Sequence, residues 1–189
     1  MGVEWNRMGK IMKGFAKNYT VVDNFLDEES FNTLKNSIIG NGDYPWYVYD
    51  SVANSRQDTK NFKPDVENNL WSWYAIHLVH SIVPQSSSFD YIFQLFKPKM
   101  DIKALIRIKV NYYPYTSEIK EHAKHIDFDY RHKGAVFSLN TCNGFTRMSN
   151  GDKVQSVANR MVFFDPSELH NSTTTSNDKG RYNINFNYF

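Results

Sequence analysis

The sequence predicts a mixed α/β protein in which a helix-bearing N-terminal half supports an antiparallel β core. Beyond residue 103 the chain consists of short apolar segments separated by turn residues, a pattern typical of a sandwich or barrel. Before residue 102, apolar residues recur at helical spacing. With 41% hydrophobic and 22% charged residues, a chain of 189 residues suits one folded domain. We therefore expect one domain over 1–189, with a support region at 1–102 and the β core at 103–189.

The first half is expected to alternate short strands with helices. Asp27 is a good N-cap for a helix whose apolar stripe is Phe31, Leu34 and Ile38, and Gly40 ends that helix. A run from Trp71 to Val83 predicts a buried helix that ends at Pro84. The other elements expected here are a basic surface helix or tail at 1–18, strands at 19–22 and 44–50, a polar loop at 54–65 and a helix at 89–96.

The second half is expected to be built from strands alone. The predicted strands are 104–113, 135–140, 144–148, 153–157, 160–164, 168–174 and 181–188.

Composition narrows the possible functions. Lys and Arg number 22 against 20 Asp and Glu, and this near balance disfavours a nucleic-acid partner, which needs clustered positive charge. The single Cys142 excludes an internal disulfide and a Cys-rich zinc site. The sequence contains no apolar run long enough to span a membrane, and its N-terminus lacks the apolar run of a signal peptide. We therefore expect a cytoplasmic protein without membrane contact, and the sequence does not predict its oligomeric state.

A metal site is predicted by His125-Ile126-Asp127. In an extended segment, residues two apart point to the same face, so both side chains could bind one ion. With six His and 13 Asp residues, chance gives about 0.4 such tripeptides, so the motif needs support. His170 in the β-rich half is a suitable third ligand. Two His and one carboxylate form the ligand set of non-haem Fe(II) oxygenases, with positions left open for a 2-oxo acid and O2.

Support comes from the last predicted strand, RYNINFNYF. Arg181, Asn183, Asn185 and Asn187 share one face of that strand, an unusual row for an apolar core. Such a face suits a polar pocket that holds a dicarboxylate, because the planar guanidinium of Arg181 matches a carboxylate. The alternative is a solvated face on an edge strand. In the strand LIRIKVNYYP, Asn111 and Tyr113 likewise share one face.

These residues resemble the pattern of the Fe(II)/2-oxoglutarate-dependent oxygenases. The resemblance is closest to the small prolyl-4-hydroxylase-like members of bacteria and phage genomes. It covers residues 103–189 and extends to the segment VVDNFLDEESFNTL. The most specific part is SLNTCNGFTRMSNGDKVQSVANRMVFFDPSELHNSTTT followed by RYNINFNYF. The resemblance implies a double-stranded β-helix, or jelly roll, with the metal inside.

The resemblance also implies roles for single residues. His125, Asp127 and His170 match the iron ligands and form the catalytic centre. Arg181 matches the residue that pairs with the far carboxylate of 2-oxoglutarate. The pair Asn111 and Tyr113, and Asn183 on the last strand, are similar to co-substrate contacts in the nucleobase demethylases. Asn187 stands where those demethylases carry a second arginine, and this departure weakens a nucleic-acid-repair function.

The implied activity is hydroxylation of an unactivated C–H bond with Fe(II), 2-oxoglutarate and O2, and ascorbate as a further cofactor. The expected substrate is a peptidyl residue such as proline. The alternatives are the same chemistry on a small molecule or nucleobase, and a jelly-roll binding module without catalysis. The sequence cannot identify the substrate.

The sequence does not assign a definite role to four further residues near these motifs. His122 competes with His125 as a ligand but has no carboxylate two residues on, which favours His125. His132 is expected at the surface, with a role near the metal or substrate as the alternative. Asn140 and Thr146 lie in the matching segment, but their residue types assign them no role.

Overall fold

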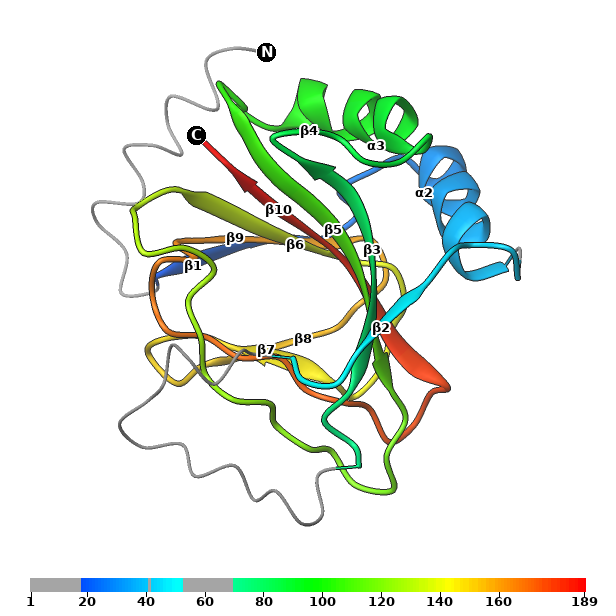
Figure 1. Cartoon of the computed structure of the whole chain (residues 1–189), viewed down its shortest axis with the longest axis vertical. Coiled ribbons are helices and arrows are strands. Elements are labelled where there is room, and N and C mark those ends of the chain that lie inside the picture. Colours follow the sequence, from blue (N-terminus) through cyan, green and yellow to red (C-terminus); the bar gives the residue numbers. More distant parts are fainter. Residues whose placement is uncertain (1–17, 41, 53–69) are drawn as a thin grey trace.

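The computed structural model describes residues 18–40, 42–52 and 70–189. The predicted loop at 54–65 and, apart from Asn18, the predicted lead-in at 1–18 lie outside these ranges. The described chain forms two facing β-sheets with helices on the outside of the larger one (Figure 1). No helix within these ranges is long and apolar enough to cross a membrane. The jelly-roll fold class, with a mainly β core, is confirmed.

The first half contains β1 (Tyr19–Val22), α2 (Glu28–Lys35), β2 (Tyr47–Tyr49), β3 (Tyr74–Ser81), β4 (Val83–Pro84) and α3 (Phe89–Phe96). Asp27 caps α2 as predicted, because its Oδ1 accepts a hydrogen bond of 2.9 Å from the Ser30 amide. A π-helical turn at Asn36–Gly40 continues α2, and a 3-10 turn at Lys97–Lys99 follows α3.

The predicted helix at Trp71–Val83 is wrong, because most of this segment forms strand β3. β3 pairs with β5 on one side and with β2 and β4 on the other. Six of its eight residues are buried, which leaves no alternation of polar and apolar residues. A strand buried on both faces has the same continuous apolar sequence as a buried helix, so periodicity cannot separate them.

The second half contains β5 (Leu105–Pro114), β6 (Lys133–Ser138), β7 (Phe145–Arg147), β8 (Lys153–Gln155), β9 (Arg160–Phe164) and β10 (Gly180–Tyr188). The larger sheet has the order β1-β9-β6-β10-β5-β3-β2, with β4 beside β3, and its pairs are antiparallel. Strands from both halves of the chain therefore share this sheet. The division into a support region at 1–102 and a β core at 103–189 stays a prediction.

The smaller sheet is the β7–β8 hairpin, extended by single bridges. Arg147 pairs with Asn171, and the segment around Asn171 pairs with residues 121–125 through Glu121–Thr173 and His125–His170. The predicted strand at 168–174 is therefore wrong as a regular strand. This segment runs along the smaller sheet but makes only isolated bridges with the described residues. Its polar side chains accept hydrogen bonds from neighbouring backbone amides that would otherwise pair with backbone carbonyls, as the Phe145 amide does with Thr173 Oγ1.

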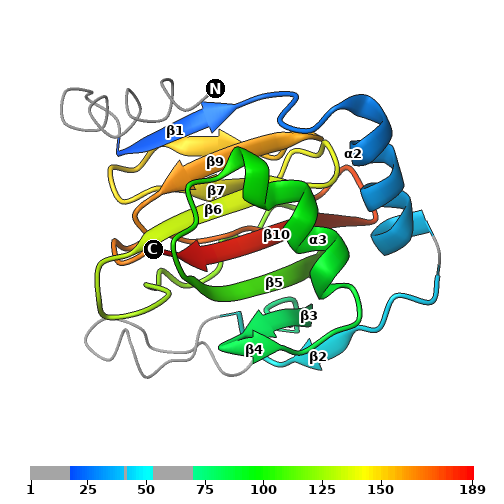
Figure 2. The same cartoon turned by 90° about the horizontal axis from the view of Figure 1, so that it is seen from above.

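The hydrophobic core lies between the outer face of the larger sheet and the helices. Figure 2 shows α2 and α3 lying against that face. Phe137 at the centre of the core is fully buried and contacts the rings of Phe25, Phe31 and Phe96. Two smaller apolar clusters lie apart from this core, one around Val136 and Val162 and one around Tyr74 and Tyr113. The polar side chains of β10 lie on the inner face of the sheet, beside these clusters.

We expect Phe137→Ala to lower the free energy of unfolding by about 3–5 kcal/mol, because it leaves a cavity among three aromatic rings. Denaturant unfolding followed by circular dichroism measures this change. The control is Phe189→Ala, whose side chain is 46% exposed and should cost less than about 1 kcal/mol. Equal losses in the two variants would contradict this location of the core.

Candidate active site

The three predicted ligand residues meet at one point inside the fold. One ligand atom each from His125, Asp127 and His170 lies within 4.8 Å of the other two. Two backbone hydrogen bonds bring the segments together, from His125 N to His170 O at 2.9 Å and back at 3.0 Å. This bridge sets the two imidazole centroids 4.6 Å apart. Asp127, two residues further on, is held by a bond of 2.9 Å from its amide to Pro166 O.

Backbone carbonyls orient both imidazoles. His170 Nδ1 lies 2.9 Å from Glu168 O, and His125 Nδ1 lies 3.3 Å from Ala123 O. A carbonyl only accepts, so each Nδ1 carries the proton and each Nε2 lone pair is free for a metal. Burial, together with the nearby His170, lowers the pKa of His125 to about 4. His125 is therefore neutral at pH 7, which is the form that binds metals.

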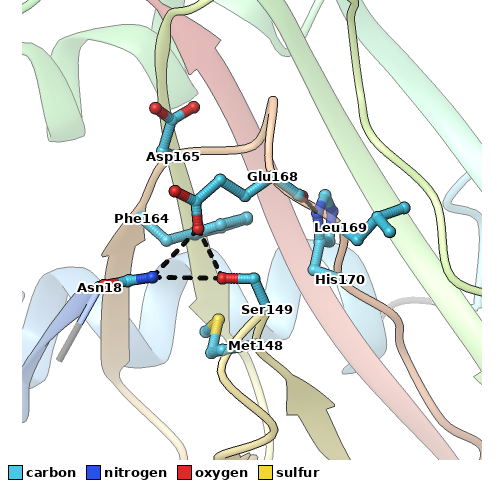
Figure 3. Close-up of a pocket in the computed structure, with 8 residues that line it drawn as sticks. All are labelled: Asn18, Met148, Ser149, Phe164, Asp165, Glu168, Leu169 and His170. Atoms are coloured by element: carbon cyan, nitrogen blue, oxygen red, sulfur yellow. Dashed lines mark hydrogen bonds between the residues drawn. The ribbon is translucent and has the colours of Figure 1, made fainter.

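Glu168 is itself anchored at the outer side of His170. Figure 3 shows the small pocket beside this histidine, with the Glu168 carboxylate bound by Asn18 and Ser149. The distances are 3.2 Å from Asn18 Nδ2 and 2.5 Å from Ser149 Oγ. These bonds restrain the loop whose carbonyl orients the imidazole.

The Asp127 carboxylate is ionised and held on both oxygens. Its Oδ2 accepts hydrogen bonds from Asn187 Nδ2 at 2.8 Å and from Asn185 Nδ2 at 3.4 Å. Its Oδ1 lies 3.1 Å from Arg107 Nη2 and 3.9 Å from His125 Nε2. Burial by itself raises the pKa of Asp127, but the surrounding cations, Arg107 above all, outweigh it and hold that pKa well below its usual value.

His132 lies in this network, and its predicted surface position is wrong. The residue is buried, its Nδ1 lies 2.8 Å from Tyr130 O, and its Nε2 lies 3.0 Å from Asn187 Nδ2. Asn187 thus links His132 to Asp127. The sequence carries no signal for this contact, because it depends on β10 lying beside β6.

The polar row of β10 lines the inside of the fold, as predicted. Arg181, Asn183, Asn185 and Asn187 are all buried, and the intervening Ile184 and Phe186 face the helices in the hydrophobic core. The alternative of a solvated edge strand is wrong, because β10 lies between β5 and β6.

Arg181 is a buried cation with unused donors. Its side chain is 1% exposed, and Nη2 donates to Thr146 Oγ1 at 2.7 Å. Its Nε and Nη1 have no hydrogen-bond partner among the described residues. Gly144 allows this position, because a Cβ there would lie 2.8 Å from Arg181 Cδ and 2.7 Å from Thr174 O. A buried guanidinium with free donors is costly, and a carboxylate ligand would satisfy it.

The other predicted contacts lie beside Arg181. Tyr113 is opposite Arg181 in the β5–β10 register, and its ring centroid lies 5.5 Å from the guanidinium carbon. Asn111 Nδ2 donates to Asn183 Oδ1 at 2.8 Å, so these two amides bind each other, and Asn111 Oδ1 is left without a partner among the described residues.

Asn140 holds the start of β10. Its Nδ2 donates to Gly180 O at 2.8 Å and its Oδ1 accepts from the Tyr182 amide at 2.9 Å. These bonds fix the backbone of Gly180 and Tyr182, the residues on both sides of Arg181. Asn140 therefore positions the arginine, and Thr146 accepts a hydrogen bond from its side chain.

Sequence reasoning missed two cations on β5. Arg107 contacts Asp127, and Lys109 points to the same inner face, with its Nζ 5.5 Å from the Tyr74 ring centroid. Lys109 forms no ion pair with any described carboxylate, and burial lowers its pKa to about 8. The alternation of the sequence LIRIKVNYYP places both on one face with Asn111 and Tyr113, but it gives neither cation a role.

Comparisons with known proteins identify the fold. No protein-family model matches the sequence, and no curated protein is similar to it. Many solved structures are similar over most of the chain, and three of them, all below 20% identity, show the range of their activities. A prolyl-4-hydroxylase from Pseudomonas putida has a TM-score of 0.58 and 16% identity, covering 92% of this chain and 93% of the other. A prolyl hydroxylase from Trichoplax adhaerens, in complex with a hypoxia inducible factor peptide, has a TM-score of 0.60 and 14% identity, covering 95% and 86%.

The third structure carries a different activity on the same fold. It is the non-heme alpha ketoglutarate dependent epimerase SnoN of nogalamycin biosynthesis, with a TM-score of 0.63 and 11% identity, covering all of this chain and 83% of the other. The chain therefore has the fold of the 2-oxoglutarate oxygenases and is prolyl-4-hydroxylase-like in structure. This fold accepts more than one kind of substrate.

We expect Asp127→Ala to weaken binding of Mn(II) at least tenfold, because it removes the charged donor of the three-residue set. Titration calorimetry measures the affinity, and circular dichroism checks the fold. Asp129→Ala is the matched control, since this exposed carboxylate lies two residues away. Unchanged Mn(II) affinity in Asp127→Ala would remove this residue from the site.

Proposed function

We propose that the protein is an Fe(II)- and 2-oxoglutarate-dependent dioxygenase that hydroxylates an unactivated C–H bond. The observation that carries the proposal is the guanidinium of Arg181, buried with two unused donor atoms in the same fold interior as the His125, Asp127 and His170 set. A 2-oxo dicarboxylate suits both ends of this arrangement. One carboxylate would pair with Arg181, and the 2-oxo acid end would reach the metal.

The described residues fit these cofactors. His125 and His170 would offer neutral Nε2 atoms, and Asp127 an ionised oxygen, which is the donor set of non-haem Fe(II) sites. When bound, Fe(II) and 2-oxoglutarate would activate O2, release succinate and CO2, and deliver one oxygen atom to the substrate C–H bond. Tyr113, Asn111 and Asn183 would line the co-substrate, and ascorbate stays a prediction as a further reductant.

The protein itself would orient and shield the reactants. The Glu168 and Ala123 carbonyls keep the imidazoles in the metal-binding tautomer, and Asn187 keeps the Asp127 carboxylate in place. These partners are buried or backbone groups and would hold the ligand set in one arrangement. Such preorganisation lowers the cost of binding.

The substrate we propose is a peptidyl residue such as proline, in a peptide or protein. The fold of two prolyl hydroxylases supports it, one of them bound to a peptide. A second candidate is a small molecule with its own acidic group. Lys109 favours it, because the metal, Asp127, 2-oxoglutarate and Arg181 together are neutral, which leaves Arg107 and Lys109 as excess positive charge. A cytoplasmic location and a phage origin stay predictions.

Anaerobic addition of Fe(II) and then 2-oxoglutarate should produce a visible charge-transfer band that requires both. We expect His170→Ala to lose the band. In Arg181→Gln, the concentration of 2-oxoglutarate needed for half-saturation should rise tenfold or more, with little change for iron, because a charge-assisted bond of about 1.5–3 kcal/mol is lost. Arg131→Gln is the control, since this side chain is 90% exposed. Iron binding without any band would leave the non-catalytic binding module as the better interpretation.

Succinate release across a matched substrate panel separates the two substrate classes. The panel contains proline-containing peptides with neutral flanks, free amino acids and organic acids, and the amides of those acids. If the acidic substrate is correct, the acids but not their amides are turned over, and Lys109→Met raises their KM at least tenfold. Lys103→Met is the control, because its side chain is 75% exposed. Turnover of neutral peptides that is unaffected in Lys109→Met supports the peptidyl substrate.

A further inference from the structure

His122 is a buried histidine that the proposed chemistry leaves without a role. It lies outside the three-residue ligand set, and its Nδ1 is 2.9 Å from Ser172 Oγ. Its Nε2 is buried and has no partner among the described residues. Of the two histidines that the sequence offers as metal ligands at this point, the ligand set of the structure therefore contains His125 and not His122.

Strand pairing aligns His122 with the Arg181 contacts. The amide of His122 donates to Ser172 O at 2.9 Å, and Glu121 pairs with Thr173, so His122 and Ser172 are opposite each other. Arg147 pairs with Asn171, which sets Thr146 opposite Ser172 on the other side. Directly opposite residues of antiparallel strands point to the same face. His122, Ser172 and Thr146 therefore form one row across the smaller sheet.

This row faces Arg181 on the larger sheet, because Thr146 accepts the bond from Arg181 Nη2. Tyr113, opposite Arg181 in its own sheet, packs on the His122 ring with 5.3 Å between centroids. Nε and Nη1 of Arg181 on the larger sheet and Nε2 of His122 on the smaller one have no hydrogen-bond partner among the described residues. No described carboxylate is hydrogen-bonded to any of these three atoms, so a ligand that accepts hydrogen bonds would satisfy them.

His122 is neutral in this position. Burial first, and then the charge of Arg181, lower the pKa of His122 to about 3. A neutral imidazole has one N–H, and the Ser172 hydroxyl can either accept a hydrogen bond from Nδ1 or donate one to it. When Ser172 donates to Nδ1, Nε2 carries the proton and becomes a donor.

We infer that His122 donates its Nε2–H to the carboxylate that Arg181 binds, and that Ser172 selects the required tautomer. The inference rests on the proposed function and adds a co-substrate-binding residue to it. The guanidinium then takes one edge of the distal carboxylate of 2-oxoglutarate, and His122 takes a remaining oxygen. Both unused groups are satisfied by one ligand.

The test compares two ligands on the Mn(II)-loaded protein by titration calorimetry. 2-Oxoglutarate carries the distal carboxylate, and 2-oxovalerate has the same carbon chain without it. We expect His122→Phe to weaken 2-oxoglutarate binding about 10- to 100-fold, as for loss of a hydrogen bond to a charged group. Affinity for 2-oxovalerate and for Mn(II) should stay within about twofold. His122→Gln, which keeps an N–H donor, should recover most of the loss.

Two further variants keep the test independent of folding. Ser172→Ala retains the imidazole and should weaken 2-oxoglutarate binding severalfold, because the tautomer is no longer selected. His80→Phe changes another buried histidine, stacked on Phe89 outside the site, and should leave both affinities unchanged. In labelled wild-type protein, the Nε2–H signal of His122 should shift on 2-oxoglutarate binding and not on 2-oxovalerate binding.

The outcomes separate this inference from the function on which it rests. If wild-type protein binds 2-oxoglutarate and His122→Phe and Ser172→Ala bind it equally well, the inference is wrong and the proposed function stands. If His122→Phe loses both ligands to the same degree, His122 has a structural role only, and the inference is again wrong. If wild-type protein with Mn(II) does not bind 2-oxoglutarate, the proposed function and the inference fail together.

Discussion

The burial of β10 on both faces is the constraint on which the rest of this structure depends. One face of the strand packs under α2 and α3 as part of the hydrophobic core, and the other carries one arginine and three asparagines into the interior. Burial of polar groups is tolerated only when they find partners. The four polar residues on the inner face of β10 therefore need hydrogen-bond partners on the neighbouring elements. Asn183 binds Asn111, Asn187 binds Asp127, and Arg181 binds Thr146 on the facing sheet.

The smaller sheet brings His125 and His170 together with little regular structure. Its segments are joined by single bridges, and one of these bridges brings His125 and His170 together. Because the pairing is irregular, some backbone carbonyls are not used in strand-to-strand hydrogen bonds and can bond to side chains instead. The carbonyls of Ala123 and Glu168 orient the two imidazoles in this way. The regular larger sheet provides rigidity, and the irregular smaller sheet provides donors and acceptors at chosen points.

Several of the buried polar atoms without a hydrogen-bond partner belong to Arg181 and His122, and both of these side chains contact the Tyr113 ring. The cationic side chains of Arg107 and Lys109 lie further along β5. Unpartnered buried polar groups reduce stability, and a ligand bound at the proposed site would satisfy those of Arg181 and His122. The same fold supports hydroxylation and epimerisation in the similar structures, and the local charges are therefore the better guide to the substrate.

Features that arise from neighbours along the chain could be predicted from the sequence. The cap at Asp27, the alternation of β10 and the spacing of His125 and Asp127 depend on short-range geometry, and each is present in the structure. Features that need distant segments to meet could not be predicted in this way. β3 has a helix-like apolar sequence and becomes a strand because β5 pairs with it, and His132 is buried because β10 lies beside β6. His122 is paired with Ser172, whereas His125 is paired with His170 at the proposed metal site. Periodicity reports which side chains share a face, whereas the identity of the facing partner is set by strand pairing across many residues.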